Sequence, residues 1–415
     1  GQAPPRDQRA TTTPWPAPQS GTRPLFAWRV HPPTADITCQ MAPRDVVLIV
    51  ATALLALGAV AVQSAGMTVT QSGTVADLAT NRTTLLAIAA VAALLLGRSI
   101  PVAWTTSRTV AVTSIVVAGV LLAFVLVPGI GSKVNGARRW INFGPIGFQP
   151  SELAKWALLL FLAWYGATRV RHMGQFRRGL LPALAVVGLL CGLILLEDLG
   201  TAVLIGTVAT IMLIAAGARL KHMIMLAVPA AAALLAAIAV EPYRLKRLQI
   251  FLDPWADPEG KGYHVIQSMA AIHGGGIGGR GLGNGIQKFG YLPEDTTDFI
   301  FSIITEEFGL LGATLVVGLF IALLWAGWRI VTSQVRPERQ LLALGIVAMI
   351  SLQTLMNLLV VTGLAPTKGI ALPLVSSGGT GWVMTAFMLG VLARLDPTAP
   401  AAAALPNEPI PEVVP

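Results

Sequence analysis

The sequence predicts an all-α polytopic membrane protein with about ten transmembrane helices. Three observations favour this fold. Hydrophobic residues make up 54% of the 415 residues and charged residues only 12%, whereas a water-soluble chain carries about 25% charged residues. Apolar runs close to the length that crosses a bilayer recur along the chain. Lys and Arg gather in the short segments between these runs, as they do in membrane proteins of fixed orientation.

The apolar runs divide the chain into a membrane domain, residues 44–395, and two tails. The ten predicted helices are 46–66, 84–104, 109–128, 151–168, 180–196, 199–217, 222–240, 300–328, 341–363 and 379–395. Only a tight turn separates the fifth from the sixth, so these two could also form one long kinked helix. Residues 1–43 and 396–415 are rich in Pro with Thr, Arg and Gln or with Ala, and we expect them to be disordered.

The basic residues of the loops predict the orientation. Clusters follow the second, fourth, sixth and eighth apolar runs: Arg98, Arg108, Arg169, Arg171, Arg177, Arg178, Arg219, Lys221, Arg329, Arg336 and Arg339. These loops and both tails are therefore expected in the cytoplasm. A basic cluster at 133–139 falls on the outer side, against the usual enrichment of Lys and Arg in cytoplasmic loops. The longest loop, 241–299, is also outside and should contain short helices at the membrane surface.

Other classes of protein fit the composition poorly. The net charge of +9 comes from loop residues and forms no basic stripe with interleaved aromatic residues, so nucleic-acid binding is not expected. The two cysteines, Cys39 and Cys191, have no zinc-ligand spacing and suggest no disulfide framework.

Three outer stretches carry charge near predicted helices. The stretch GARRWINFG (136–144) contains Arg139, and FQPSELAK (148–155) places Glu152 and Lys155 in the first turn of a helix. The stretch EDLGTA (197–202) places Asp198 between two apolar runs. These residues could bind a substrate, or they could only pair with each other at the membrane interface.

The outer loop adds two arginines and a group of carboxylates. Arg244 and Arg247 lie one helical turn apart and suit a pyrophosphate, although an amphipathic segment at lipid headgroups has the same pattern. Glu294 and Asp298 precede the eighth helix. If that helix begins near Asp298, then this residue, Ser302 and Glu306 share one face.

The glycines at 276–281 spell G-x-G-x-x-G, but no strand precedes them, which excludes a dinucleotide site. A carboxylate beside apolar residues and other carboxylates has a raised pKa, which suits Asp298 to the role of general base. The alternative is an acidic loop in water.

A last irregular stretch, APTKGIALPLVSSGGTG (365–381), interrupts sequence of membrane depth. Such backbone survives there only where it is buried or lines a cavity. Lys368 would then point into that cavity, or else extend to the interface.

Taken in order, these blocks resemble the signature motifs of the SEDS family (shape, elongation, division and sporulation) over about residues 44–395. The motif QKFGYLPE is more similar to the division type (FtsW-like) than to the elongation type (RodA-like). The chain departs from the family at Thr296 or its neighbour, where a His is common, and at Glu197, where Pro is common.

The resemblance implies a peptidoglycan glycosyltransferase that polymerises lipid II and releases undecaprenyl pyrophosphate. It further implies a class B penicillin-binding protein as partner, together with other division proteins. Asp298 would be the catalytic base for an inverting transfer. Glu294, Lys368, Arg139, Glu152, Lys155 and Asp198 would bind substrate, with Arg244 and Arg247 as further ligands of the pyrophosphate. Asp298 and Glu294 could hold Mg²⁺ or Mn²⁺.

Two other functions stay open at this point. The chain could be a lipid II transporter, whose charges line a path for the headgroup. It could also be a non-catalytic scaffold of the division machinery, in which Asp298 would be dispensable.

Overall fold

The computed structural model describes residues 41–66, 81–134, 137–143, 146–196, 198–240, 242–260, 262–377 and 379–397. The predicted tails lie outside these residues except at their inner ends. The side chains of 133, 134, 137, 143, 146, 237 and 242–245 are also outside the description, and with them Arg244.

All ten predicted apolar segments form helices. They are α1 (Pro43–Ala65), α3 (Arg82–Ser99), α5 (Arg108–Leu126), α6 (Pro150–Thr168), α7 (Leu181–Leu195), α8 (Leu199–Ala215), α9 (Leu220–Val240), α12 (Ile300–Ser333), α13 (Pro337–Val361) and α14 (Thr380–Arg394). A short α4 (Val102–Thr105) and a π-helical turn, η1 (Phe176–Leu180), lie between them. The fifth and sixth segments are separate helices, α7 and α8, so no single kinked helix forms there.

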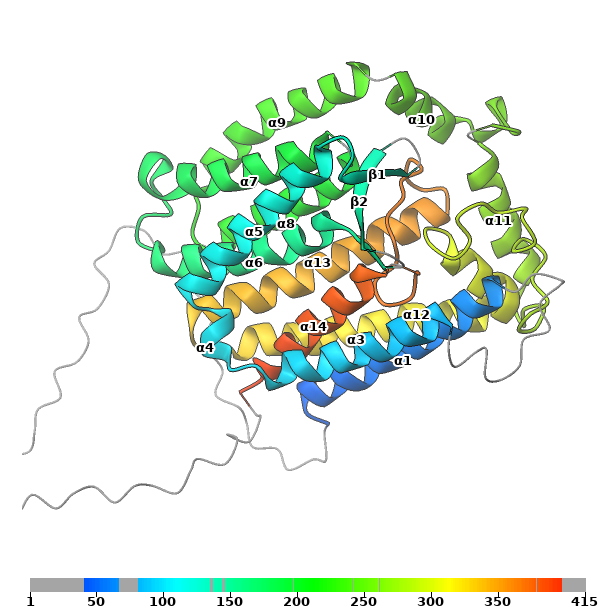
Figure 1. The fold of residues 1–415 in the computed structure, drawn as a ribbon, viewed down its shortest axis with the longest axis horizontal. Coiled ribbons are helices and arrows are strands. Elements are labelled where there is room, and N and C mark those ends of the chain that lie inside the picture. Colours follow the sequence, from blue (N-terminus) through cyan, green and yellow to red (C-terminus); the bar gives the residue numbers. More distant parts are fainter. Residues whose placement is uncertain are drawn as a thin grey trace, which may run out of the picture.

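Seven helices in the described part of the chain are long and apolar enough to cross a membrane: α1, α3, α5, η1 with α7, α9, α12 and α13. Two more, α8 and α14, are apolar but have only 17 and 15 residues. This confirms the polytopic helical membrane fold. The helices run roughly parallel or antiparallel to each other in one bundle (Figure 1).

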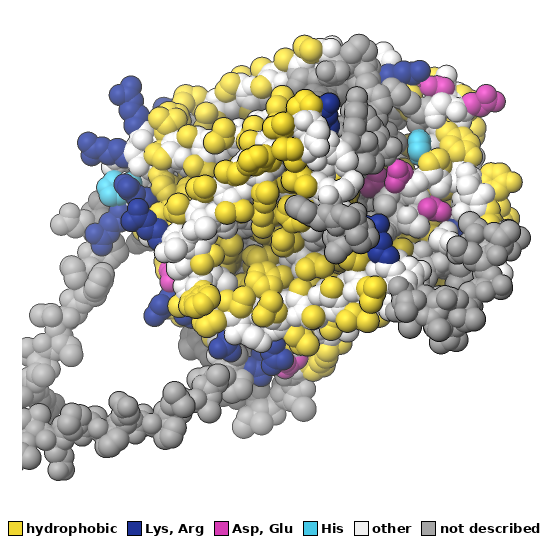
Figure 2. Space-filling view, in the orientation of Figure 1, with side chains coloured by type: hydrophobic (Ala, Val, Ile, Leu, Met, Phe, Trp, Pro, Cys, Tyr) yellow, Lys and Arg dark blue, Asp and Glu magenta, His cyan; other side chains and the backbone are white. Residues whose placement is uncertain are grey.

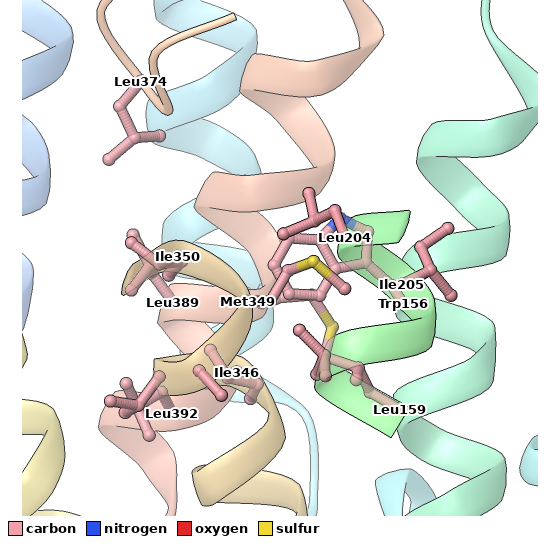
Figure 3. Packing of buried hydrophobic residues seen from close by; sticks show 14 of the residues in the cluster. Trp156, Leu159, Leu204, Ile205, Ile346, Met349, Ile350, Leu374, Leu389 and Leu392 are labelled. Carbon is pink, nitrogen blue, oxygen red and sulfur yellow. The ribbon is translucent and has the colours of Figure 1, made fainter. Parts of the chain in front are cut away.

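The core of the bundle is built from α6, α8, α13 and α14. Trp156, Leu204, Met349 and Leu389 are among its buried side chains and meet in the middle of the bundle (Figure 3). On another side α3 packs along α14. Gly97 and Gly390 allow this close approach, because a Cβ on either glycine would collide with the backbone of the opposite helix.

One segment that the sequence analysis expected as an outer loop forms strands. β1 (Gly131–Val134), β2 (Ala137–Phe143) and β3 (Ile146–Phe148) make an antiparallel sheet in the order β1-β2-β3. Trp, Ile and Phe in this stretch favour extended backbone, and pairing satisfies the backbone groups that a membrane interface would leave unbonded. The sheet lies at the end of the bundle where α10 and α11 are found (Figure 1).

The long loop contains the short helices that the sequence predicts: α10 (Pro242–Leu252), the 3₁₀ turn η2 (Pro254–Ala256) and α11 (Tyr263–Gly275). Its later part packs against a kink in α12. Gly309 has φ 65° and breaks the helix, and the backbone of Arg280 and Gly281 donates to the carbonyls of Glu306 and Glu307. The loop thereby satisfies carbonyl groups that the kink frees.

Candidate functional site

A cavity of about 1050 Å³ lies at the end of the bundle that carries the sheet. Its wall combines β2, the first turns of α6 and α8, the turn before α12 and the irregular stretch 367–377. All the predicted site residues whose side chains the structure describes line the cavity: Arg139, Glu152, Lys155, Asp198, Arg247, Glu294, Asp298 and Lys368. These residues span more than half of the chain, and the fold brings them to one place.

Asp298 lies in the turn just before α12, which begins at Ile300. Burial, followed by the charges of Glu294 and Asp198, raises the pKa of its carboxyl to about 7, against the lowering effect of Lys368 and Arg139. A carboxyl with this pKa exchanges its proton near neutral pH. No donor in the described residues hydrogen-bonds to the carboxyl, so it is available to a substrate.

Asp198 is the carboxylate that pairs with two cations of the cavity, Lys368 and Arg139. It caps α8 by accepting the amide of Thr201 at 2.9 Å. It also accepts hydrogen bonds from Lys368, and from Arg139 at 3.3 Å. Although burial alone would raise the pKa of Asp198, these two cations and the hydrogen bonds hold it below its usual value. One carboxylate therefore holds two cations, which leaves excess positive charge facing the cavity.

The cations differ in how firmly they are held. Lys368 is 19% and Arg139 29% exposed. Burial lowers the pKa of Lys368; Asp198 opposes this shift, and Arg139 and Arg247 add to it. Arg247 donates to the carbonyl of Thr367 at 3.1 Å, one residue before Lys368. The buried Nε of Arg139 has no hydrogen-bond partner in the described structure. A substrate oxygen could supply that partner.

Glu152 and Lys155 form a second ion pair in the wall, with Nζ and Oε2 2.8 Å apart. Lys155 is only 2% exposed and also donates to Gln353 at 3.0 Å. Gln353 in turn donates to the carbonyl of Ala371 at 2.8 Å. Lys155 thus faces the protein more than the cavity, and its contacts orient Glu152, which is 15% exposed.

Glu294 has backbone strain. Its φ of 58° is uncommon for a residue with a side chain. The turn around it holds this conformation, since its carbonyl accepts the amides of Thr297 and Phe299 and its carboxylate accepts the hydroxyl of Thr297 at 2.8 Å. Strain of this kind is frequent at functional sites.

The structure corrects the expectation for Glu306. Its carboxylate accepts the backbone amides of Ile286 and Gln287, at 2.9 and 3.2 Å, and it does not line the cavity. The sequence analysis assumed that the helix begins near Asp298, so that Asp298 and Glu306 share one helical face. Because α12 begins at Ile300, two residues later, Asp298 is not part of this helix.

Sequence analysis missed several residues of the cavity wall: Trp140, Asn142, His264 and Trp382. His264 stacks on Phe299, and burial and Arg247 lower the pKa of its imidazole despite Glu294 and the Pro293 carbonyl. The aromatic residues had a possible signal, because Trp140 directly follows Arg139 in a motif that the analysis singled out. His264 had no comparable signal beside its position in the long loop.

The carboxylates of the cavity were also considered as metal ligands. The described residues contain no group of three or more His, Cys, Asp or Glu arranged to hold a metal ion. Asp298 and Glu294 provide two hard oxygen donors, and Mg²⁺ often binds through one or two carboxylates plus substrate phosphates. The residues fit a cation only if substrate and water complete its ligands.

Comparison with known proteins shows the family to which the chain belongs. The family model FTSW_RODA_SPOVE, described as cell cycle protein, matches residues 44–399. Stage V sporulation protein E of Bacillus subtilis is 42% identical over 289 residues, which cover 69% of this chain and 79% of that protein. The "Probable peptidoglycan glycosyltransferase FtsW" of Coxiella burnetii is 42% identical over 66% of this chain and 75% of its own length.

Solved structures show the same fold. A chain from a structure described as "Structural coordination of polymerization and crosslinking by a peptidoglycan synthase complex" matches with a TM-score of 0.67 and 29% identity, over 84% of this chain and 96% of that one. The rod shape determining protein RodA of Thermus thermophilus matches with a TM-score of 0.56 and 27% identity, over 84% and 95% of the two chains. The chain therefore belongs to the FtsW, RodA and SpoVE family of cell cycle proteins, the SEDS family that its motifs resemble.

Proposed function

We propose that this chain is a peptidoglycan glycosyltransferase that polymerises lipid II into glycan strands in septal synthesis. The observation that carries the proposal is the pairing, in one cavity, of a carboxyl whose pKa is about 7 with a cluster of cations. Glycosyl transfer from a pyrophosphate donor needs both: a base for the attacking hydroxyl and positive charge for the leaving group.

In the proposed reaction, Asp298 takes the proton of the 4-hydroxyl on the acceptor sugar. The hydroxyl oxygen forms a bond with the anomeric carbon of the donor, while the bond from that carbon to the pyrophosphate oxygen breaks. The pyrophosphate leaves with the electron pair as undecaprenyl pyrophosphate. One base and one stabilised leaving group suffice for inversion, so no second carboxylate is needed as nucleophile.

Arg139, Lys368 and Arg247 are suited to neutralise the pyrophosphate. All three line the cavity, and Asp198 balances the charge of only one of them. Guanidinium groups bind phosphate oxygens through two parallel hydrogen bonds, which gives direction as well as charge. Arg244 is on the same helix as Arg247 and stays a proposed ligand outside the described side chains.

A divalent cation, Mg²⁺ or Mn²⁺, would be held by Asp298 and Glu294 together with pyrophosphate oxygens. When bound, such an ion would add positive charge at the leaving group. The cations of the protein, Arg139, Lys368 and Arg247, would serve the same purpose.

The arrangement of charge supports a cavity at the outer face of the bacterial cytoplasmic membrane, with both termini in the cytoplasm. Lys and Arg gather at the end of the bundle opposite the sheet and α11 (Figure 2). Basic ends of membrane proteins face the cytoplasm. The cavity would then open where lipid II headgroups are exported.

A lipid II transporter is less consistent with the interior of the bundle. A transport path needs polar groups along the whole way through the membrane. The charges of the cavity instead lie at one end, and apolar side chains such as Leu159, Ile346 and Leu392 fill the core below them (Figure 3).

We further propose that a class B penicillin-binding protein cross-links the product, within a larger set of division proteins. The similarity to a chain of a peptidoglycan synthase complex supports a partner of this kind. The FtsW names among the relatives support a role in division.

The test uses purified protein with fluorescent lipid II, with and without its candidate transpeptidase, in the presence of Mg²⁺. Glycan polymer on gels from the wild type, and its absence with Asp298→Ala, is the expected result. Transport of lipid II across vesicle membranes without any polymer would contradict the proposal. Equal division phenotypes of wild type and Asp298→Ala in cells would favour the scaffold.

A further inference from the structure

Two amide side chains on α13 lie close to the cavity, of which Gln353 lines it and Asn357 does not. Gln353 and Asn357 are four residues apart, which places them on the same face of the helix. Both are buried, at 7% and 1% exposure, in a helix whose buried side chains are mostly apolar. A buried amide costs free energy unless it is hydrogen-bonded, so its partners indicate its purpose.

Asn357 uses both hydrogens of its amide group on backbone carbonyls from different parts of the chain. Its Nδ2 donates to the carbonyl of Asp298 and to the carbonyl of Ile370, each at 2.8 Å. Its Oδ1 has no partner in the described structure. The side chain therefore acts as a double donor that joins the turn before α12 to the irregular stretch after α13.

These two carbonyls belong to the segments that shape the surroundings of the base. The residue before Ile370 is Gly369, and a Cβ there would lie 2.6 Å from Oδ2 of Asp298. The carboxyl of Asp298 thus fills the space that the missing side chain leaves. Lys368 precedes Gly369, so the same short segment also carries a cation of the cavity.

Gln353 repeats the arrangement one turn away. It donates to the carbonyl of Ala371, next to Ile370, and accepts from Lys155. The stretch 370–371 is consequently fixed to α13 at two successive carbonyls. Asn357 is the one of the two amides that also reaches Asp298.

We propose that Asn357 is a positioning residue for the transfer reaction, which holds the carboxyl of Asp298 in register with the 368–371 segment. It does not line the cavity and touches no substrate. The inference rests on the proposed function, because it assigns Asn357 to the base of that reaction. Removal of its two hydrogen bonds lets the base and the segment move relative to each other.

The experiment measures kcat and KM for lipid II in wild type, Asn357→Ser and Asn357→Leu, with the thermal melting point of each preparation. A shift of about 1 Å in a reacting group costs about 100-fold in rate. We expect kcat to fall by about 10- to 100-fold while KM changes by less than about threefold. Ser leaves room for water to bond the two carbonyls, so this variant should keep its fold.

Thr354→Val is the matched control. Thr354 is on the same helix and 5% exposed, its hydroxyl has no hydrogen-bond partner in the described structure, and it does not line the cavity. This variant should keep wild-type kcat and KM.

Three results would overturn the positioning role. They are wild-type kcat in folded Asn357→Ser, an equal loss of kcat in Thr354→Val, or a failure of both Asn357 variants to fold, which would mark Asn357 as purely structural. Absence of polymer from the wild type in the same assay would instead contradict the proposed function itself.

Discussion

Two clusters of buried charge in the described part of the chain are built differently. In the first, around Lys288 and Glu307, every charge has a protein partner. Lys288 and Glu307 are each 1% exposed and 2.9 Å apart, and Ser64 donates to Glu307 at 2.8 Å. This closed cluster joins the loop before Asp298 to α1 and α12.

The second cluster, in the cavity, is left open. Asp198 has two cations, Arg139 keeps an unbonded Nε in the described structure, and Asp298 has a carboxyl without a donor there. Full pairing makes buried charge tolerable, whereas incomplete pairing leaves binding capacity for a ligand. The structural cluster and the functional cluster therefore differ in how completely their hydrogen bonds are satisfied, more than in burial or charge.

The largest expected effect is on the rate, from Asp298→Asn. The amide cannot accept the proton of the acceptor hydroxyl, and loss of a general base costs about 10²- to 10⁴-fold. Polymerisation of fluorescent lipid II measures this effect. Asp257→Asn is the control, since Asp257 is an aspartate of the same outer loop that does not line the cavity.

The largest effect on stability should come from the closed cluster. Lys288→Met leaves Glu307 buried without its cation, and such a change costs about 3–5 kcal/mol. Thermal unfolding in detergent should show a lower midpoint, and the double variant with Glu307→Leu should recover part of the loss. A midpoint unchanged by Lys288→Met would remove the distinction between the two clusters.

Loss of one cavity cation should weaken substrate binding. Lys368→Met removes a charge-assisted hydrogen bond worth about 1.5–3 kcal/mol, so the KM for lipid II should rise by about 10- to 100-fold. Lys246→Met is the control, because Lys246 is 54% exposed and pairs with Asp257 outside the cavity. An equal KM for the two variants would show that the cluster does not bind the pyrophosphate.

The pH dependence follows from Asp298. Its carboxyl must be deprotonated to act, and its pKa is about 7. The rate should therefore rise about tenfold per pH unit below 7 and level off above it. A rate that stays constant between pH 5 and 8 would contradict Asp298 as the base.

The contribution of Asp298 to the free energy of unfolding should fall as the pH rises, whereas the rate should increase. The unfolded chain releases the proton of Asp298 near pH 4, whereas the folded protein keeps it up to about 7, so folding is progressively destabilised between these values. Asp298→Asn lacks this effect. Its melting midpoint relative to wild type should be higher at pH 8 than at pH 4.5.

The smallest and least direct effect concerns the metal. If Asp298 and Glu294 hold Mg²⁺ or Mn²⁺ with the substrate, EDTA should lower the rate and added Mg²⁺ should restore it. Glu294→Gln should raise the Mg²⁺ concentration needed for half-maximal rate. A rate insensitive to EDTA would assign the leaving group to Arg139, Lys368 and Arg247 alone.

Sequence reasoning predicted the helices well, because apolar length is a strong local signal. It also found most of the charged residues that line the cavity, since Glu152, Asp198 and Lys368 are charges beside membrane segments, where charge is costly. It could not predict the partners. Asp198 and Lys368 are 170 residues apart in the chain, and only the packing of the bundle brings them together.

The residues that sequence reasoning missed carry weak local signals. Asn357 is one amide among apolar residues of a helix, and nothing in its neighbours indicates that it bonds Asp298. Glu306, in contrast, has a strong local signal that points to the wrong place, because its charge and its spacing from Asp298 resemble those of a site residue. The kink at Gly309 and the loop packed against it give its carboxylate backbone amides to bind.

The most direct test measures rate and melting midpoint on the same preparations of wild type, Asp298→Asn and Lys288→Met. We expect the two variants to lose different properties. Asp298→Asn loses polymerisation without any lowering of its melting midpoint, while Lys288→Met melts earlier and keeps its rate per folded molecule. Polymerisation by folded Asp298→Asn at the wild-type rate would contradict the central claim that the open cluster is the reaction centre.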